Sequence, residues 1–129
     1  MTDSLSPPSI DAAIRMIAMP ADTNPSGDIF GGWLMSMMDM AGGNIAYRRA
    51  GGRVATVAVD KIEFHRPVAV GDVVSCFGEV VRVGNPSLTV AVSAWVQARQ
   101  GGEEVKVTEG LFTFVALDRK GDPRPVDMP

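Results

Sequence analysis

The sequence predicts an α+β fold in which a curved antiparallel β-sheet wraps around one long central α-helix. A continuous apolar segment without proline runs from Gly31 to Arg49 and is typical of a buried helix. Four segments of alternating apolar and polar residues follow it, separated by turn-forming residues, which indicates β-hairpins. In two of the four segments, the apolar residues move from odd to even positions partway along. Such a shift indicates a β-bulge, which curves a sheet.

The first predicted strand covers residues 12–19 (AAIRMIAM), a short and mostly apolar segment. Residues 20–28 (PADTNPSGD) are dense in turn-forming residues and predict a loop. Asp28 or Ser26, near the end of this loop, could accept hydrogen bonds from the first turn of the next helix and so cap it.

The predicted helix runs from about Gly31 to Arg49. Its apolar content is continuous, and Arg48 and Arg49 lie in the last turn, where the helix dipole favours cations. The sequence GGR at residues 51–53 then ends the helix.

The most regular predicted strand is residues 87–100 (SLTVAVSAWVQARQ). Its alternation puts one apolar set on a single face: Leu88, Val90, Val92, Ala94 and Val96. Residues 72–83 (DVVSCFGEVVRV) predict the preceding strand, and the turn VGNPS at 83–87 joins the two into a hairpin. The segment ARQGGEE closes a second hairpin.

The two strands with a phase shift are residues 54–65 and 104–117. The apolar set moves from Val57 and Val59 to Ile62 and Phe64 in the first, and from Val105 and Val107 to Phe112 and Phe114 in the second. Gly110 is a natural site for the second bulge, because glycine inside a strand often marks one.

A sheet that covers one side of the helix leaves the other side and the sheet edges open. A second copy of the chain could cover them by symmetric pairing, so we expect a dimer or a larger assembly. Gly42 and Gly43 each cost roughly 1 kcal/mol relative to Ala inside a helix, which predicts close backbone approach there. Packing of helix against helix across the dimer is the simplest form of that approach.

Length and composition fit one globular domain. The chain has 129 residues, of which 46% are hydrophobic, and this is enough to bury a core. We expect a single domain over residues 1–129, with a flexible N-terminus at 1–11 and an irregular tail at 118–129. The net charge of −3 gives no general attraction to nucleic acid or membrane, so a polyanionic ligand would need a local basic pocket.

The first residues, MTDSLSPPSIDA, carry Asp and Pro where a secretory signal would have a basic end and an apolar run, and we expect a cytoplasmic protein. No segment is long and apolar enough to predict a membrane span. The single cysteine, Cys76, excludes an internal disulfide. Cys76 and the single histidine, His65, cannot form a tetrahedral zinc site without carboxylates, so we expect no structural metal.

Asp39 is the unexpected residue of the predicted helix, because an unpaired carboxylate among apolar side chains is costly. Pairing along a helix would need a cation at 35, 36, 42 or 43, and these positions hold Met, Ser, Gly and Gly. The carboxylate either lies at the open face, accepts hydrogen bonds from Ser36 or from a neighbouring strand, or has a function.

Gly31 and Gly32 favour the functional interpretation. At a helix start, their backbone N–H groups are free, are not covered by side chains and lie at the positive end of the dipole. Such groups could polarise a carbonyl oxygen.

Several of these stretches together resemble a known family. AMPADTNPSGDIFGGWLMSMMDMAGG, RVATVAV, F-x-RPV-x-VGDVV and FTFVALD resemble the bacterial acyl-CoA thioesterases of the hotdog superfamily, close to the YciA type. The resemblance covers residues 12 to about 125. It implies the hotdog fold, with a curved sheet around a central helix, and a dimer whose two active sites lie at the interface. Such proteins often assemble three dimers into a hexamer.

The resemblance implies hydrolysis of acyl-CoA to a free acid and coenzyme A, without metal or redox cofactor. It assigns the catalytic carboxylate to Asp39, as a general base that activates water or as a nucleophile, and these two routes stay open. It assigns the N–H that holds the thioester oxygen to Gly31, and Gly32 follows it as a further donor near the substrate.

Further substrate-binding residues are predicted around this centre. Asn24 resembles a position that contacts substrate from the partner subunit, although it also suits a turn. Asp28 stands where some relatives carry an Asn, and Phe30 stands where phenylacetyl-type relatives carry a His. Thr56 could direct its hydroxyl toward Asp39, although Thr is also a common strand residue.

For the phosphates of coenzyme A, the sequence suggests Arg82 with Asn85 and Ser87 at the hairpin turn. The alternative is that these residues form a solvated strand end and its turn.

The same residues also bear on other functions. A hotdog dehydratase or hydratase would need a histidine at the site, but His65 falls at a strand end, where surface placement is expected. A Cys76–His65 nucleophile pair is possible, but an isolated Cys in an alternating strand more often packs in a core. The chain has no G-x-S-x-G motif of a serine hydrolase. A non-catalytic acyl-CoA-binding module would not need Asp39, and a purely structural oligomer predicts no concave pocket at the helix start.

Overall fold

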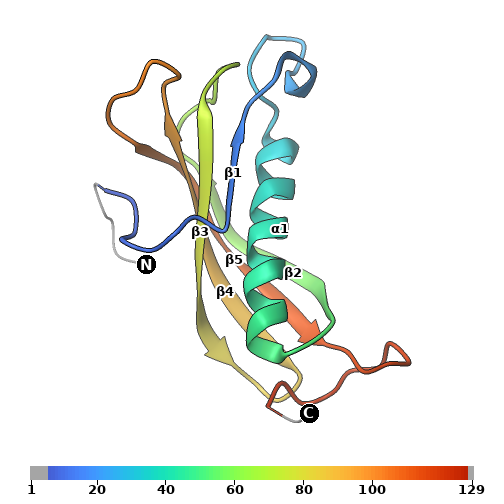
Figure 1. Ribbon diagram of the computed structural model, residues 1–129. Helices are drawn as coiled ribbons and strands as arrows, with labels where there is room; N and C mark the ends of the chain where they lie inside the picture. The colour runs from blue at the N-terminus through green and yellow to red at the C-terminus, as the bar shows by residue number, and fades with distance from the viewer. Residues whose placement is uncertain (1–5, 128–129) are drawn as a thin grey trace.

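One α-helix packs against a curved five-stranded antiparallel sheet in the computed structural model, which describes residues 6–127 (Figure 1). The elements are β1 (Ile14–Ile17), a short 3-10 helix η1 (Pro20–Asp22), α1 (Gly31–Ala50), β2 (Val54–Phe64), β3 (Val73–Val83), β4 (Ser87–Gln97) and β5 (Val105–Ala116). The strand order is β1-β3-β4-β5-β2. The parts of the predicted N-terminus and tail at 1–5 and 128–129 lie outside the described residues. Within residues 6–127, no helix has both the length and the apolar content to cross a membrane.

The predicted helix is confirmed almost to the residue. Gly51 ends α1 in the left-handed conformation, with φ of 70°, and its N–H donates to the Tyr47 carbonyl over 2.9 Å. The predicted cap at Asp28 or Ser26 is wrong, because Phe30 occupies the N-cap position and its side chain makes no capping hydrogen bond. The chain first passes through buried Ile29, whose N–H donates to another loop, and the helix starts only after it.

The predicted bulge in β2 is confirmed, and there are two. The β2–β5 register shifts between Thr56 and Ala58 and again between Asp60 and Glu63. The second shift includes Lys61, which is the only described residue other than glycine with a positive φ, 52°. Such a backbone stores local strain and turns the strand, so β2 bends across the helix.

The bulge predicted in β5 is at a different residue. Where β5 pairs with β4, Ala94 is opposite Thr108 and Trp95 is opposite Lys106. Val107 therefore has no partner in β4 and is the extra residue of the bulge. Gly110 instead lies across from the bulge in β2, where a Cβ atom would come within 3.3 Å of the Ile62 Cβ. Glycine at 110 therefore makes room for a bulge in the neighbouring strand.

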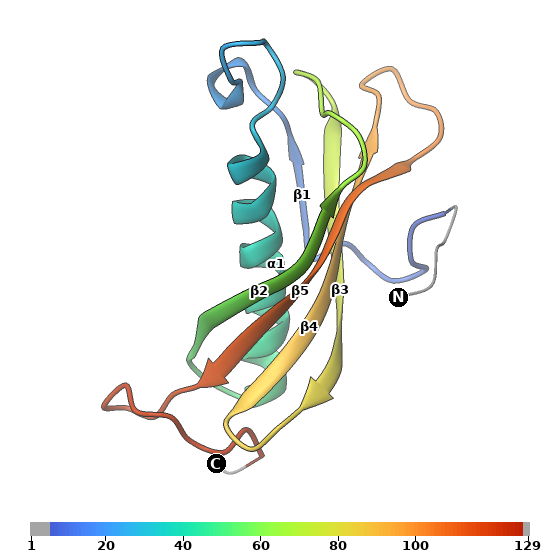
Figure 2. The same cartoon turned by 180° about the vertical axis from the view of Figure 1, so that it is seen from behind.

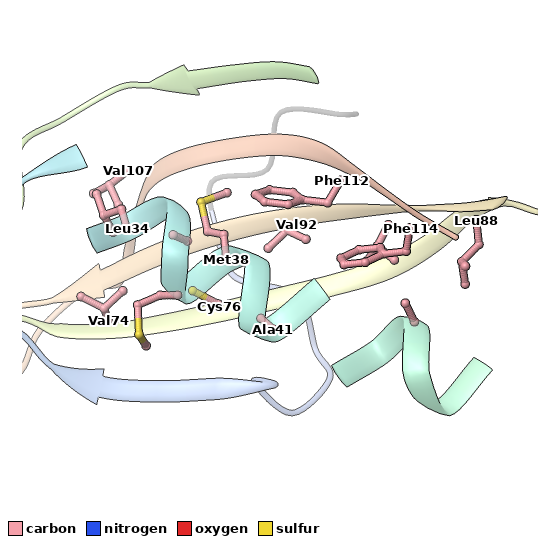
Figure 3. Close-up of a cluster of buried hydrophobic side chains, with 14 of the residues drawn as sticks. Leu34, Met38, Ala41, Val74, Cys76, Leu88, Val92, Val107, Phe112 and Phe114 are labelled. Atoms are coloured by element: carbon pink, nitrogen blue, oxygen red, sulfur yellow. The ribbon is translucent and has the colours of Figure 1, made fainter. Parts of the chain in front are cut away.

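The core lies between α1 and the inner face of the sheet (Figure 3). Fully buried side chains from both layers fill it, among them Met37, Met38, Val74, Leu88, Val90, Val92, Val107, Phe112 and Phe114. Gly42 is also buried, and a Cβ atom there would lie 3.2 Å from both Phe114 and Val92. The expectation of helix-to-helix packing at Gly42 is thus wrong, since the close approach is to the sheet of the same chain.

The N-terminal segment lies on the opposite face of the sheet from the helix (Figure 2). Pro8 and Ile10 line a hollow there together with Trp95. Trp95 is only 2% exposed although it points away from the helix. The N-terminal segment therefore helps to cover Trp95, which is not part of the core between α1 and the sheet.

The opposite side of α1 and the β2 edge stay open, as the sequence predicted. Met40, Tyr47 and Val57 are 52%, 55% and 58% exposed, which is unusual for three large apolar side chains in one region. β2 is an edge strand of the sheet, so one row of its backbone groups has no strand partner in the described chain.

Candidate functional site

A pocket opens at the start of α1. It has a volume of about 350 Å³ and is lined by Ile29, Gly31, Leu34, Phe64, His65, Arg66, Pro67 and Val68. The motif F-x-RPV therefore forms one wall, and the first helical residue forms the other. The chain brings these segments together because the Ile29 N–H donates to the Val68 carbonyl over 3.0 Å.

The backbone of Gly31 and Gly32 is accessible at this pocket. Both residues are exposed, and within residues 6–127 their N–H groups donate no hydrogen bond to the preceding loop. A Cβ atom on Gly31 would lie 3.4 Å from the Phe64 ring, and one on Gly32 would lie 3.4 Å from the Phe30 ring. The glycines thus leave two N–H donors uncovered at the positive end of a 20-residue helix.

Asp39 lies in the middle of α1 and is partly exposed. Its Oδ1 accepts a hydrogen bond from the Thr56 hydroxyl over 2.7 Å, so the contact suggested by the sequence is present. In the described chain no cation pairs with this carboxylate. The hydrogen bond fixes the direction of the carboxylate and leaves its second oxygen available for another group.

One chain does not bring Asp39 and Gly31 to the same point. The two residues are eight positions apart on a continuous helix, which corresponds to about 12 Å along its axis. A single carbonyl group cannot contact the Gly31 N–H and also receive a water held by Asp39 of the same helix. Within one chain the two groups therefore stay apart, which is consistent with the expected location of active sites between two chains.

Asn24 organises the loop before the helix. Its Oδ1 accepts hydrogen bonds from the Ser26 N–H over 2.9 Å and from the Asp28 N–H over 3.1 Å. Its own N–H donates to the Asp28 carbonyl over 2.7 Å. This is the turn geometry that the alternative interpretation of Asn24 predicted, and Asp28 is exposed at the end of the turn. Phe30, 41% exposed, follows it beside the pocket mouth.

The residues predicted to bind phosphate lie at the other end of the molecule. Arg82 and Asn85 are exposed and Ser87 is half-buried at the β3–β4 turn, which Figure 1 places near the C-terminal end of α1. The Asn85 carbonyl accepts the Val126 N–H over 2.8 Å, which ties this turn to the C-terminal segment. Within one chain these three residues do not approach Gly31.

Of the two rival nucleophilic residues, Cys76 is enclosed in the core, whereas His65 lines the pocket at the start of α1. Cys76 is 0% exposed, and burial raises the pKa of its thiol to about 12. His65 lies 3.0 Å from a Glu109 oxygen. Burial raises the pKa of Glu109, but hydrogen bonds and charges from Lys106 and His65 outweigh it and lower the pKa below 4.5. Among residues 6–127 no three His, Cys, Asp or Glu side chains gather in a way that could hold a metal ion.

Sequence reasoning missed a second cluster. Six of the twelve basic residues of the chain are in two short segments, 48–53 and 119–124, each next to glycines. The C-terminal segment folds back under the end of α1 and brings the two segments together (Figure 1). The uneven distribution of arginine was visible in the sequence, but the contact between the two segments was not.

Known proteins are similar to this chain in sequence and in fold. The profile of the thioesterase superfamily matches residues 26–103. The acyl-CoA thioester hydrolase YciA of Escherichia coli is 49% identical over 120 residues, which cover 91% of each chain. A hexameric thioesterase from Yersinia pestis is 48% identical, with 93% of this chain and 98% of that chain covered and a TM-score of 0.86.

A further solved structure is a hexameric broad specificity acyl-coenzyme A thioesterase in which an aspartate is replaced by alanine. It is 47% identical, covers 89% of this chain and 85% of that chain, and has a TM-score of 0.85.

Proposed function

Because this chain belongs to the thioesterase superfamily, among the hotdog acyl-CoA thioester hydrolases of the YciA type, we propose that it cleaves acyl-CoA with Asp39 and the Gly31 N–H as its catalytic groups. The products are a free carboxylic acid and coenzyme A. The observation that carries the assignment is Asp39 itself, a carboxylate that has no cation partner among residues 6–127 and that is oriented by Thr56 on the open side of the helix.

As a general base, Asp39 takes a proton from a water molecule whose oxygen attacks the thioester carbon. The C=O electron pair moves to the carbonyl oxygen, and the Gly31 N–H stabilises the negative charge there. When the C=O bond re-forms, the C–S bond breaks, and the leaving sulfur of coenzyme A accepts a proton. As a nucleophile, Asp39 would attack the same carbon and form an anhydride that water then cleaves.

Two chains are needed for either route, because Gly31 and Asp39 are about 12 Å apart on one helix. In the proposed dimer, Gly31 of one chain faces Asp39 of the partner subunit, and the β2 edges and the open sides of both helices meet. The exposed Met40, Tyr47 and Val57 support this interface, since burying them would remove a large apolar surface from water. The hexameric relatives support a further assembly of three such dimers.

A subunit-mixing experiment tests the shared site. Gly31→Pro removes the N–H, and proline is tolerated at the first helical position. The preceding Phe30 already has the extended conformation that proline requires, with φ of −74° and ψ of 147°. Gly31→Ala is the matched control because it keeps the N–H, and the new methyl group meets only an ordinary contact with Phe64.

Gly31→Pro and Asp39→Ala homo-oligomers are each expected to be nearly inactive. Co-refolding the two variants should restore thiol release, because a mixed dimer has one site with both Gly31 and Asp39 intact. If each site were within one chain, no mixture could contain an intact site. Mixtures that stay inactive, although mass spectrometry shows mixed oligomers, would therefore refute the shared site.

Thr56 gives a further prediction at the same site. Thr56→Val keeps the shape of the side chain but removes the donor to Asp39, so kcat for acyl-CoA hydrolysis is expected to fall about tenfold or more. Thr56→Ser keeps the hydroxyl and should retain most of the activity. Equal activity of the Val and Ser variants would show that this hydrogen bond does not matter for the reaction.

A further inference from the structure

A second pocket lies at the opposite end of α1 from Gly31. It has a volume of about 860 Å³, within the range of pockets that hold small ligands. Its walls are the last turn of the helix, the link to β2, the residues after β5 and the C-terminal segment. The lining residues are Arg48, Arg49, Ala50, Gly51, Gly52, Arg53, Leu117, Asp118, Arg119, Arg124, Val126 and Asp127. We call it the arginine pocket.

Two of its arginines have structural partners. Arg124 donates to the Ala50 carbonyl over 2.8 Å and to the Leu117 carbonyl over 3.2 Å, so it joins the C-terminal segment to the end of the helix. Gly52 permits this approach, because a Cβ atom there would lie 3.1 Å from the Arg124 guanidinium. Arg49 forms an ion pair with Asp127 over 2.7 Å.

The other three arginines have no such partner. Arg48, Arg53 and Arg119 are exposed, and within residues 6–127 none of them makes a side-chain hydrogen bond or an ion pair. The Asp118 carboxylate, on the same wall, already accepts the Lys120 and Asp122 N–H groups. Three guanidinium groups are therefore available to a ligand in the pocket.

The charge of the pocket is opposite to that of the protein. Five arginines against two aspartates give the lining a net charge of +3, whereas the whole chain carries −3. The negative end of the helix dipole amounts to only about half a charge, and Arg124 already satisfies one of its carbonyls. Stabilising the helix end therefore does not account for Arg53 and Arg119, which lie outside the helix.

The walls are held in place by backbone contacts. The Leu117 N–H donates to the Arg53 carbonyl over 2.9 Å, and the Val126 N–H donates to the Asn85 carbonyl over 2.8 Å. The pocket is thus built from two segments that are distant in the sequence, 48–53 and 117–127, and the second is also held by the β3–β4 turn at Asn85. Guanidinium groups arranged in this way suit phosphate, because each can donate two parallel hydrogen bonds to it.

We propose that the arginine pocket binds the phosphates of a nucleotide group. Coenzyme A is one source of such a group, and this choice rests on the proposed function. Its nucleotide end carries a diphosphate and a further phosphate, and a long flexible arm joins this end to the thiol. Arg48 is nine residues beyond Asp39, about 14 Å along the helix, a separation that an extended ligand could span between the carboxylate and the pocket. A free nucleotide is the other source with the same chemistry.

The test compares Arg48→Ala, Arg53→Ala and Arg119→Ala with Arg99→Ala, an exposed arginine in the β4–β5 loop that loses the same charge. Each protein is assayed with an acyl-CoA and with the matching S-acyl pantetheine, which has the same thioester but no phosphate. For each pocket variant we expect KM for acyl-CoA to rise about tenfold with kcat unchanged. We expect no change with S-acyl pantetheine and none in the Arg99 variant.

Calorimetry with coenzyme A and with ADP separates the possible outcomes without relying on hydrolysis. Loss of coenzyme A binding in the pocket variants, with the KM change, identifies the substrate nucleotide as the ligand. Loss of ADP binding without a KM change identifies a free nucleotide. Unchanged binding of both, or equal loss of activity with both substrates, overturns the proposal. Normal nucleotide binding by a wild-type protein that hydrolyses nothing would instead refute only the proposed function.

Discussion

Asp39→Ala is expected to lower kcat for acyl-CoA hydrolysis by about three orders of magnitude, within the range lost when a positioned base is removed. The carboxylate accepts the Thr56 hydroxyl and is partly exposed, so its removal leaves no buried charge without a partner. The fold should therefore survive, and KM should change little. Release of free thiol from a panel of acyl-CoAs measures the effect.

Asp39→Asn is the matched control, since it keeps the size of the side chain and can still accept the Thr56 hydrogen bond. It should be as inactive as the alanine variant if the negative charge is required. A single turnover in water labelled with a heavy oxygen isotope tests for an anhydride that water cleaves at the Asp39 carbon. Label transferred to Asp39 indicates that anhydride, whereas label found only in the product acid means that water attacked the acyl carbon. Activity near the wild-type level in both variants would remove Asp39 from the mechanism.

Phe114→Ala is expected to lower the free energy of unfolding by about 3–5 kcal/mol, which is a large part of the stability of a small protein. Phe114 is 1% exposed and lies between α1 and the sheet, where it meets the uncovered backbone of Gly42 and the side chain of Val92 (Figure 3). Because Gly42 has no side chain, this position of the helix supplies no atoms that could move into the space left by the ring.

Denaturant unfolding at one fixed protein concentration measures the change, because assembly contributes to apparent stability. Val81→Ala is the control, since Val81 is 49% exposed on β3, and it should change the free energy by less than about 0.5 kcal/mol. A loss below about 1 kcal/mol for Phe114→Ala would contradict the description of this core.

The sequence was most informative where local chemistry decides the structure. The αL glycine at Gly51 and the polar loop before Gly31 bounded the helix at both ends. The phase shift in β2 predicted its bulges. The position of the β5 bulge at Val107 could not be predicted, because it depends on the register with β4, which is a long-range property. For the same reason, a helical glycine such as Gly42 predicts close approach without revealing which neighbour approaches.

The candidate site shows the same limit. The sequence supplied Asp39, Gly31 and Thr56, and the contact that it suggested between Thr56 and Asp39 is present. It did not reveal that Gly31 and Asp39 of one chain are too far apart to act on one carbonyl, since that follows only from an unbroken helix between them. The arginine pocket was missed because it exists only where the tail returns to the helix end.

The depth of Cys76 has a consequence for an enzyme whose product is itself a thiol. Thiol–disulfide exchange needs an accessible sulfur in its thiolate form, and the only sulfhydryl of this chain has neither property, being fully enclosed with a pKa of about 12. Released coenzyme A, and its oxidised disulfide, therefore find no sulfur with which to form a mixed disulfide. Repeated turnover is therefore expected to leave Cys76 unmodified by the coenzyme A that the reaction releases.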